Sequence, residues 1–140
     1  MSAFARLGLV LPFAFLVSAP MAFAEGDPVA GERIFQRCAV CHGIGDTERQ
    51  PGPNLNNLIG RVAGTQPDFT RYSANMREAG EGGLVWTAET IDPYIENPRR
   101  VIPRGNMAFQ GLRNAQERAD VIAYIAQFSE PAEDGEEAAD

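Results

Sequence analysis

The segment Cys38-Ala39-Val40-Cys41-His42 decides how this chain folds. Its two cysteines lie three positions apart, on about one turn of a helix, and a histidine follows directly. In the C-x-x-C-H pattern each thiol can add to a vinyl group of a c-type haem, and the histidine is then placed under the iron. We therefore expect one haem c, attached through Cys38 and Cys41, with His42 as an axial ligand.

Other uses of the two cysteines are weaker interpretations of the same segment. A disulfide between Cys38 and Cys41 is possible in an oxidising compartment. A thioredoxin-like redox pair needs a βαβ setting, which the pattern of this chain does not indicate. A structural zinc site needs four ligands, whereas the chain contains two cysteines and one histidine.

The first 24 residues have the features of a cleaved secretory signal. Arg6 supplies a positive charge, residues 7–17 are apolar, and Ala22-Phe23-Ala24 matches a cleavage site. We expect the mature chain to begin at Glu25. An uncleaved membrane anchor is the alternative, but residues 7–24 are short for a spanning helix and contain two prolines.

Charge divides the rest of the chain into a domain and a tail. The sequence contains no lysine, and its formal net charge is −7. Residues 25–129, the predicted domain, hold 13 acidic residues against 11 arginines, so this part is nearly balanced. Residues 130–140 hold six acidic residues and are predicted to be a disordered tail. No basic stripe with interleaved aromatic residues indicates a nucleic-acid partner.

The spacing of apolar residues and helix caps predicts an all-α fold with about three main helices, short ones and long loops. The first helix should start at Asp27-Pro28 and lead into the cysteine segment. The last should run over 115–128 behind a cap at Asn114. Between them we expect loops over 43–69 and 99–112, a short helix over 71–79 ended by Gly80, and a helix from Thr87 to Asn97-Pro98 that Pro93 kinks.

The second axial ligand of the iron cannot be a histidine, because His42 is the only one in the chain. Residues 25–140 contain two methionines, Met76 and Met107. Met76 lies in a predicted helix, where methionine usually fills core space. Met107 lies in a loop rich in proline and glycine, which can bring a thioether to the opposite face of the haem. These arguments favour Met107 and leave Met76 as the alternative.

Over residues 26–128 the sequence resembles the class I cytochromes c, specifically the group of mitochondrial cytochrome c and bacterial cytochrome c2. The resemblance implies the class I fold, with long loops wrapped round one covalent haem, and it implies that Met107 is the axial ligand opposite His42. The segments that carry it are Gly31 with Phe35, Gly52-Pro53-Asn54-Leu55, Gly60-Arg61, Trp86, Tyr94 to Pro98, Ile102-Pro103, Met107-Ala108-Phe109 with Gly111, and Glu117 to Tyr124.

The same resemblance implies roles around the haem. The Pro53 carbonyl should accept a hydrogen bond from the second ring nitrogen of His42. Near the propionates we expect Trp86 and Tyr72 as donors, with Arg61 close by. On the Met107 side we expect Tyr94 and Asn75 as polar neighbours, and Phe109 as a shield of the iron face. Packing of the first helix on the last should involve Gly31, Phe35, Val121 and Tyr124.

These features together predict a soluble, monomeric, periplasmic one-electron carrier rather than an enzyme. The resemblance implies transient redox partners, with a donor such as a bc1-type complex and an acceptor such as an oxidase or reaction centre. It also implies a basic docking face made of Arg37, Arg99, Arg100 and Arg113. Two alternatives stay open: a haem enzyme or ligand-binding cytochrome with an open iron site, and a tethered electron-transfer subunit of an oxidase or dehydrogenase.

Overall fold

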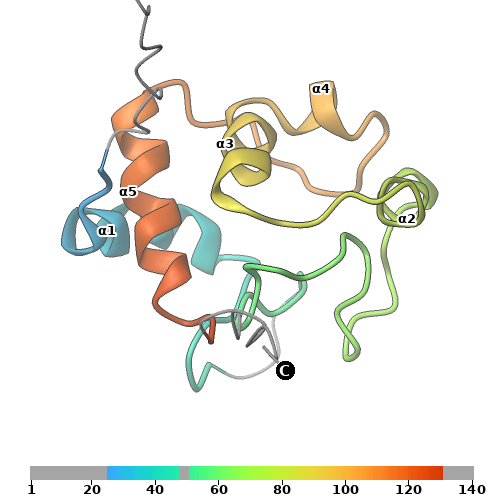
Figure 1. Ribbon diagram of the computed structural model, residues 1–140, viewed down its shortest axis with the longest axis horizontal. Coiled ribbons are helices and arrows are strands. Elements are labelled where there is room, and N and C mark those ends of the chain that lie inside the picture. Colours follow the sequence, from blue (N-terminus) through green and yellow to red (C-terminus); the bar gives the residue numbers. More distant parts are fainter. Residues whose placement is uncertain (1–24, 48–50, 131–140) are drawn as a thin grey trace, which may run out of the picture.

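The structure is a computed structural model that describes residues 25–47 and 51–130. These ranges contain helices and no strands, apart from one isolated antiparallel bridge between Val62 and Val85. The prediction of an all-α chain is confirmed. The helices are α1 (Pro28–Ala39), α2 (Ala74–Glu81), α3 (Ala88–Glu96), α4 (Pro98–Val101) and α5 (Ala115–Ala126) (Figure 1).

Short polar side chains begin the helices where the sequence predicts. The Asp27 carboxylate accepts a hydrogen bond from the backbone N–H of Val29 at the start of α1. Thr87 and Thr90 form a capping box at the start of α3. Asn114 accepts from the first turn of α5. The caps therefore explain why these three helices begin where they do.

Three boundaries differ from the prediction. The second helix begins at Ala74 rather than Arg71, because the Ser73 hydroxyl accepts from the backbone of Met76 and makes Ser73 the cap. It also runs past Gly80 to Glu81. The last helix ends at Ala126, two residues before the predicted end.

The central helix has the predicted ends, but a further helix follows it directly. α3 continues through Pro93 and ends at Glu96. Asn97 then caps a further helix, α4, in a segment predicted to be loop, and its side chain accepts from Arg100 N at 3.3 Å. Pro98 occupies the first position of α4, where a missing N–H costs nothing. The helix therefore ends at Asn97 as predicted and is not divided at Pro93, whereas α4 was not predicted.

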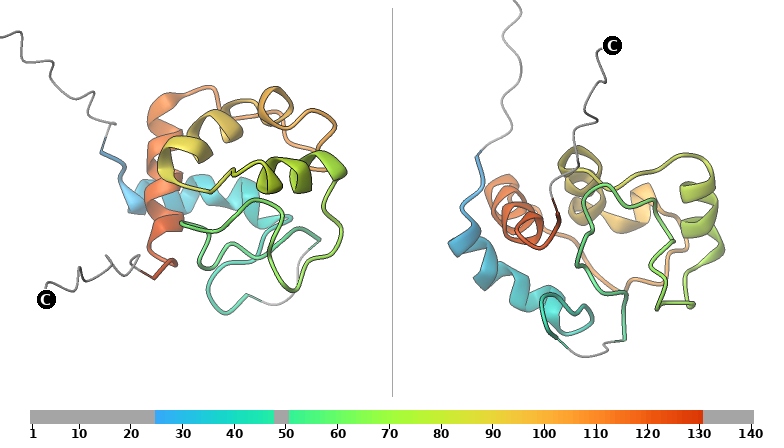
Figure 2. Two further views of the ribbon diagram at one scale, coloured as in Figure 1. Left: turned by 45° about the vertical axis from the view of Figure 1, so that its right-hand side comes forward. Right: turned by 60° about the horizontal axis from the view of Figure 1, so that its bottom comes forward.

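The packing of α1 against α5 joins the two ends of the domain (Figures 1 and 2). A Cβ atom at Gly31 would overlap the backbone carbonyl of Asp120, so the two backbones approach as closely as they do only because Gly31 has no side chain. The Phe35 and Tyr124 rings lie 5.3 Å apart beside this contact, and Val121 is 1% exposed. The four residues predicted to pack here do so.

The buried side chains of the other helices and loops form a single core that extends from this contact. Its buried members come from every part of the domain and include Leu58, Trp86, Ile91, Ile102 and Leu112. In the described ranges, no helix is long and apolar enough to cross a membrane. The predicted signal, 1–24, and all of the predicted tail beyond Glu130 lie outside the described residues.

We predict that Gly31→Ala destabilises the folded protein strongly. The added methyl group forces α1 and α5 apart, and overpacking of this kind costs about 1–3 kcal/mol in the free energy of unfolding. Gly82→Ala is the control, since Gly82 has a φ of −76° and the nearest atoms to its added Cβ are 3.2 and 3.4 Å away. Thermal unfolding measures both, and equal melting temperatures for the two variants would contradict the argument.

Candidate haem site

A cavity of about 500 Å³ opens between α1, α3, α5 and the loops. Cys38, Cys41 and His42 reach it from the end of α1, and Met107 reaches it from the loop between α4 and α5. Most of its wall is apolar, which suits a large flat macrocycle. The apolar lining includes Leu55, Leu58, Trp86, Ile91, Phe109, Leu112, Val121 and Ile125.

The imidazole of His42 is held in one orientation. Its Nδ1 lies 2.8 Å from the carbonyl oxygen of Pro53. A carbonyl can only accept, so Nδ1 carries the proton and Nε2 keeps a free lone pair. The loop that supplies the carbonyl is itself tied to the cysteine segment, because Gly52 N donates to Cys41 O at 2.6 Å.

Gly52 is required for that close approach of the loop. A Cβ atom there would lie 2.7 Å from Cys41 O and 3.0 Å from the His42 ring. A side chain at this position would push the loop away and lengthen the bond between His42 and Pro53. The imidazole orientation therefore depends on a residue that is not itself a ligand.

Burial sets the protonation of the groups at this end of the cavity. It lowers the pKa of His42, and the hydrogen bond to Pro53 opposes the shift only in part, so the neutral, metal-binding form is favoured. Burial also raises the pKa of the Cys38 thiol to about 11, while the positive charge of Arg37 acts in the opposite direction. Cys41 is exposed, so the two thiols have different access to solvent.

Met107 has a polar neighbour. The Tyr94 hydroxyl donates towards its Sδ at 3.9 Å, and the Tyr94 ring lies 4.9 Å from the ring of Trp86. Met76 also lines the cavity, from α2, and is buried. The structure thus places both candidate methionines at the cavity wall, with a tyrosine hydroxyl beside the sulfur of Met107.

The residues present fit a covalently attached haem. Two thiols and an imidazole with a free nitrogen enter the cavity at one end, and a thioether enters from a different loop. Trp86, which is only 7% exposed, lines the same cavity.

The propionate-side residues predicted from the resemblance share one region. Arg61 donates to the carbonyl of Asn54 at 3.0 Å and to that of Asn56, which ties its guanidinium to the loop after the cysteine segment. Burial lowers the pKa of Arg61, and the nearby Tyr72 hydroxyl opposes this shift. Tyr72 also lines the cavity and stacks edge-on against Phe69, with ring centroids 4.8 Å apart.

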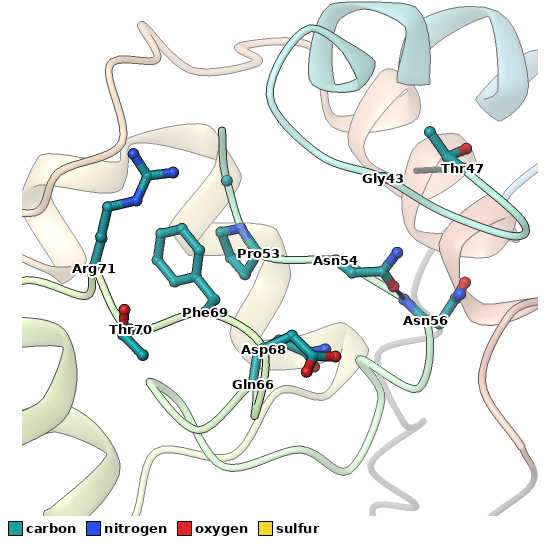
Figure 3. Close-up of a pocket in the computed structure, with 11 residues that line it drawn as sticks. Gly43, Thr47, Pro53, Asn54, Asn56, Gln66, Asp68, Phe69, Thr70 and Arg71 are labelled. Atoms are coloured by element: carbon teal, nitrogen blue, oxygen red, sulfur yellow. Dashed lines mark hydrogen bonds between the residues drawn. The ribbon is translucent and has the colours of Figure 1, made fainter. Parts of the chain in front are cut away.

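A second, more polar pocket of about 580 Å³ adjoins this region (Figure 3). Gly52, Pro53, Phe69 and Arg71 line both spaces. The remaining lining residues come from 43–56 and 66–70 and include Asn54, Asn56, Gln66 and Asp68. The polar pocket is therefore an extension of the same site at its loop-covered end.

The structure brings together most, but not all, of the predicted site residues. Asn75 is an exception, since it lies half-buried on α2 and is not part of the cavity wall. The wall contains Cys38, Cys41, His42, Pro53, Arg61, Tyr72, Trp86, Tyr94, Met107 and Phe109.

The four predicted docking arginines are all exposed. Arg37 lines the cavity opening and pairs with Glu117 at 3.4 Å. Arg100 pairs with Glu96 at 2.8 Å. Exposed pairs of this kind contribute little to stability. The arginines are thus available at the surface, two of them in weak ion pairs.

Sequence reasoning missed one buried group beside the site. Arg118 is 8% exposed and forms an ion pair with Asp92, with 2.7 Å between Nε and Oδ1. Its position carried a signal, because residues 118, 121, 122 and 125 form the buried stripe of α5. A charge on such a stripe needs a buried partner.

Comparison with known proteins agrees with this site. The family model described as cytochrome c matches residues 28–129. Cytochrome c2 of Rhodomicrobium vannielii is 46% identical over 114 residues, which cover 81% of this chain and 88% of that protein. Cytochrome c2 of Afifella marina is 45% identical over 105 residues, covering 74% and 84%. The solved structure of cytochrome c2 from Rhodospirillum centenum superposes with a TM-score of 0.70 at 40% identity, covering 75% of this chain and all of that one.

We predict that Tyr94 is the last of the three tyrosines to ionise. Burial raises the pKa of Tyr94 to about 12, and the neighbouring Tyr72 acts in the same direction. An unfolded tyrosine ionises near 10, so the folded chain binds one more proton than the unfolded chain between those values, and its stability falls as the pH rises through this window. The absorbance of tyrosinate follows the titration.

Two variants assign the titration steps. Tyr94→Phe should remove the step near pH 12, whereas Tyr124→Phe should remove an earlier one. Loss of the earlier step in Tyr94→Phe would show that this hydroxyl is not buried as described.

Proposed function

Because this chain belongs to the cytochrome c family, we propose that it is a periplasmic one-electron carrier whose single haem c is ligated by His42 and Met107. Membership of this family establishes the fold of the class I cytochromes c and the covalent haem c. The ligand pair, the compartment and the partners are the proposal.

The observation that carries the proposal is the placement of two different donors in one apolar cavity. His42 enters from the end of α1 with Nε2 free, and Met107 enters from the loop between α4 and α5. Two protein ligands leave no open coordination position for a substrate. A closed iron site supports electron transfer rather than catalysis on a bound molecule.

Each residue of the site contributes to holding or shielding the group. Bound haem c supplies one-electron exchange at its iron. Cys38 and Cys41 tether it, and Pro53 fixes the orientation of the His42 ring. Ile91, Leu112 and Phe109 keep water from the apolar part of the cavity.

The hydroxyl of Tyr94 gives the sulfur of Met107 a polar contact. A hydrogen bond to a ligand sulfur withdraws electron density from it and tunes the reduction potential. The hydrogen bond from Tyr94 to Met107 therefore helps to set the reduction potential of the haem.

The proposed compartment and partners rest on several independent features. The first 24 residues have the pattern of a cleaved export signal. The relatives reported above are named cytochrome c2. A bc1-type complex as donor and an oxidase or reaction centre as acceptor fit a small monomeric carrier whose contacts are transient.

Arginine would have to supply any positive docking face, because the chain has no lysine. We propose that Arg37, Arg99, Arg100 and Arg113 form it. All four are exposed, and complementary charge raises the rate of encounter with an acidic partner.

We predict that Met107→Ala converts the protein from one that does not bind CO in the ferrous state to one that binds it rapidly. Removal of the thioether opens the sixth position of the iron. Met76→Leu is the matched control, because Met76 also lines the cavity but is proposed only to fill space. Rapid CO binding by Met76→Leu, with none by Met107→Ala, would reassign the ligand.

We predict that Arg99→Glu and Arg100→Glu each slow electron transfer to an acidic redox partner at low ionic strength, by up to about tenfold. The difference from wild type should disappear at high salt, because salt screens exposed charges. Arg33→Glu is the control, since it makes the same charge change at an exposed position of α1 outside the cavity wall. Equal rates for all three variants would contradict the docking face.

A further inference from the structure

The ion pair of the buried Arg118 with the partly buried Asp92 connects α5, α3 and the end of the loop that carries Met107. Besides its contact with Asp92, the Arg118 guanidinium donates through Nη1 to the carbonyl of Leu112 at 3.0 Å and to that of Arg113 at 3.1 Å. One rigid, planar group therefore binds three acceptors from two segments.

These contacts hold residues 111–113, the C-terminal stem of the loop that carries Met107. Leu112 is 3% exposed and lines the haem cavity, and its backbone N–H donates to Ile95 O at 2.8 Å. Gly111 packs so closely on the end of α3 that a Cβ atom there would overlap the carbonyl of Glu96. This stem is thus held in place from two sides, by α3 and by Arg118.

The other stem is anchored locally. Ile102 N donates to Pro98 O at 2.8 Å, and Gly105 N donates to Ile102 O at 3.1 Å. These two hydrogen bonds attach the N-terminal stem of the loop to α4. Met107 lies between the two stems, in a stretch with no helix of its own. Tyr94 contacts its sulfur, and Asn106 Nδ2 donates to Arg71 O at 3.0 Å, but among the described residues the backbone of the loop is held only at its two stems.

We propose that Arg118, oriented by Asp92, is a positioning residue that holds the Leu112 stem and so keeps Met107 against displacement from the iron. The inference rests on the proposed function, because it requires Met107 to be the ligand. Asp92 orients the guanidinium and neutralises it. Among the described residues no buried side-chain polar atom lacks a partner, so loss of Asp92 would leave a buried charge uncompensated.

The test measures how easily an added ligand displaces Met107. Imidazole is titrated into the ferric holoprotein, and loss of the sulfur-to-iron charge-transfer band reports the replacement. Arg118→Lys keeps the charge but cannot reach all three acceptors, and Asp92→Asn removes the counter-charge. Each should bind imidazole about tenfold more tightly than wild type, because the free loop is easier to open.

Asp120→Ala separates positioning from general loss of stability. Asp120 lies on the same helix as Arg118, is 7% exposed and accepts from Asp27 N and from Gln116. This variant should melt at a lower temperature but bind imidazole like wild type, because Asp120 faces α1 rather than the loop.

The outcomes are distinct. Unchanged imidazole affinity in Arg118→Lys and Asp92→Asn, or an equal gain in Asp120→Ala, would overturn the positioning role while leaving Met107 as the ligand. If Arg118→Lys fails to retain haem, the less buried Asp92→Asn, with its side chain 27% exposed, decides alone. A wild-type protein without the sulfur band would instead overturn the proposed function.

Discussion

At Gly31 the backbone of α1 meets the carbonyl of Asp120 on α5, and both walls of the haem site are built out from this contact. The end of α1 carries Cys38, Cys41 and His42 into the cavity. Two residues before Asp120, α5 carries Arg118 to the stem of the opposite loop. A displacement of α1 relative to α5 would therefore move His42 relative to Arg118, which holds the loop that carries Met107.

The two proposed ligands are held by different means. His42 is fixed at short range, because the carbonyl that orients it belongs to a loop tied to Cys41 only one residue away. Met107 lies in the middle of a loop without helix. Backbone contacts with α3, α4 and α5 hold the two ends of this loop, and near its middle the Tyr94 hydroxyl contacts Met107 Sδ and Asn106 donates to Arg71 O at 3.0 Å. Met107 is thus held less firmly than His42. Segments that are held weakly in this way are the ones that open locally in folded proteins.

Much of this arrangement could be predicted from local pattern. Asp27, Thr87 and Asn114 identify helix starts because caps act over three or four residues, and the cysteine segment identifies the haem end of α1. The placement of Asn75 outside the cavity wall and the pairing of Arg118 with Asp92 could not, because each depends on segments distant in the chain. The end of α3 at Asn97 was predicted from Asn97-Pro98, whereas the short helix α4 that follows was missed, because its segment is rich in proline and glycine.

Electron transfer without substrate binding requires that a histidine nitrogen and a methionine sulfur occupy both axial positions of the iron. The most direct measurement is the absorption spectrum of the ferric wild-type protein in the near-infrared. A low-spin spectrum with a sulfur-to-iron charge-transfer band, lost in Met107→Ala and kept in Met76→Leu, is the predicted result. A high-spin ferric spectrum without that band in the wild-type protein would contradict a closed site, and with it the proposal of an electron carrier.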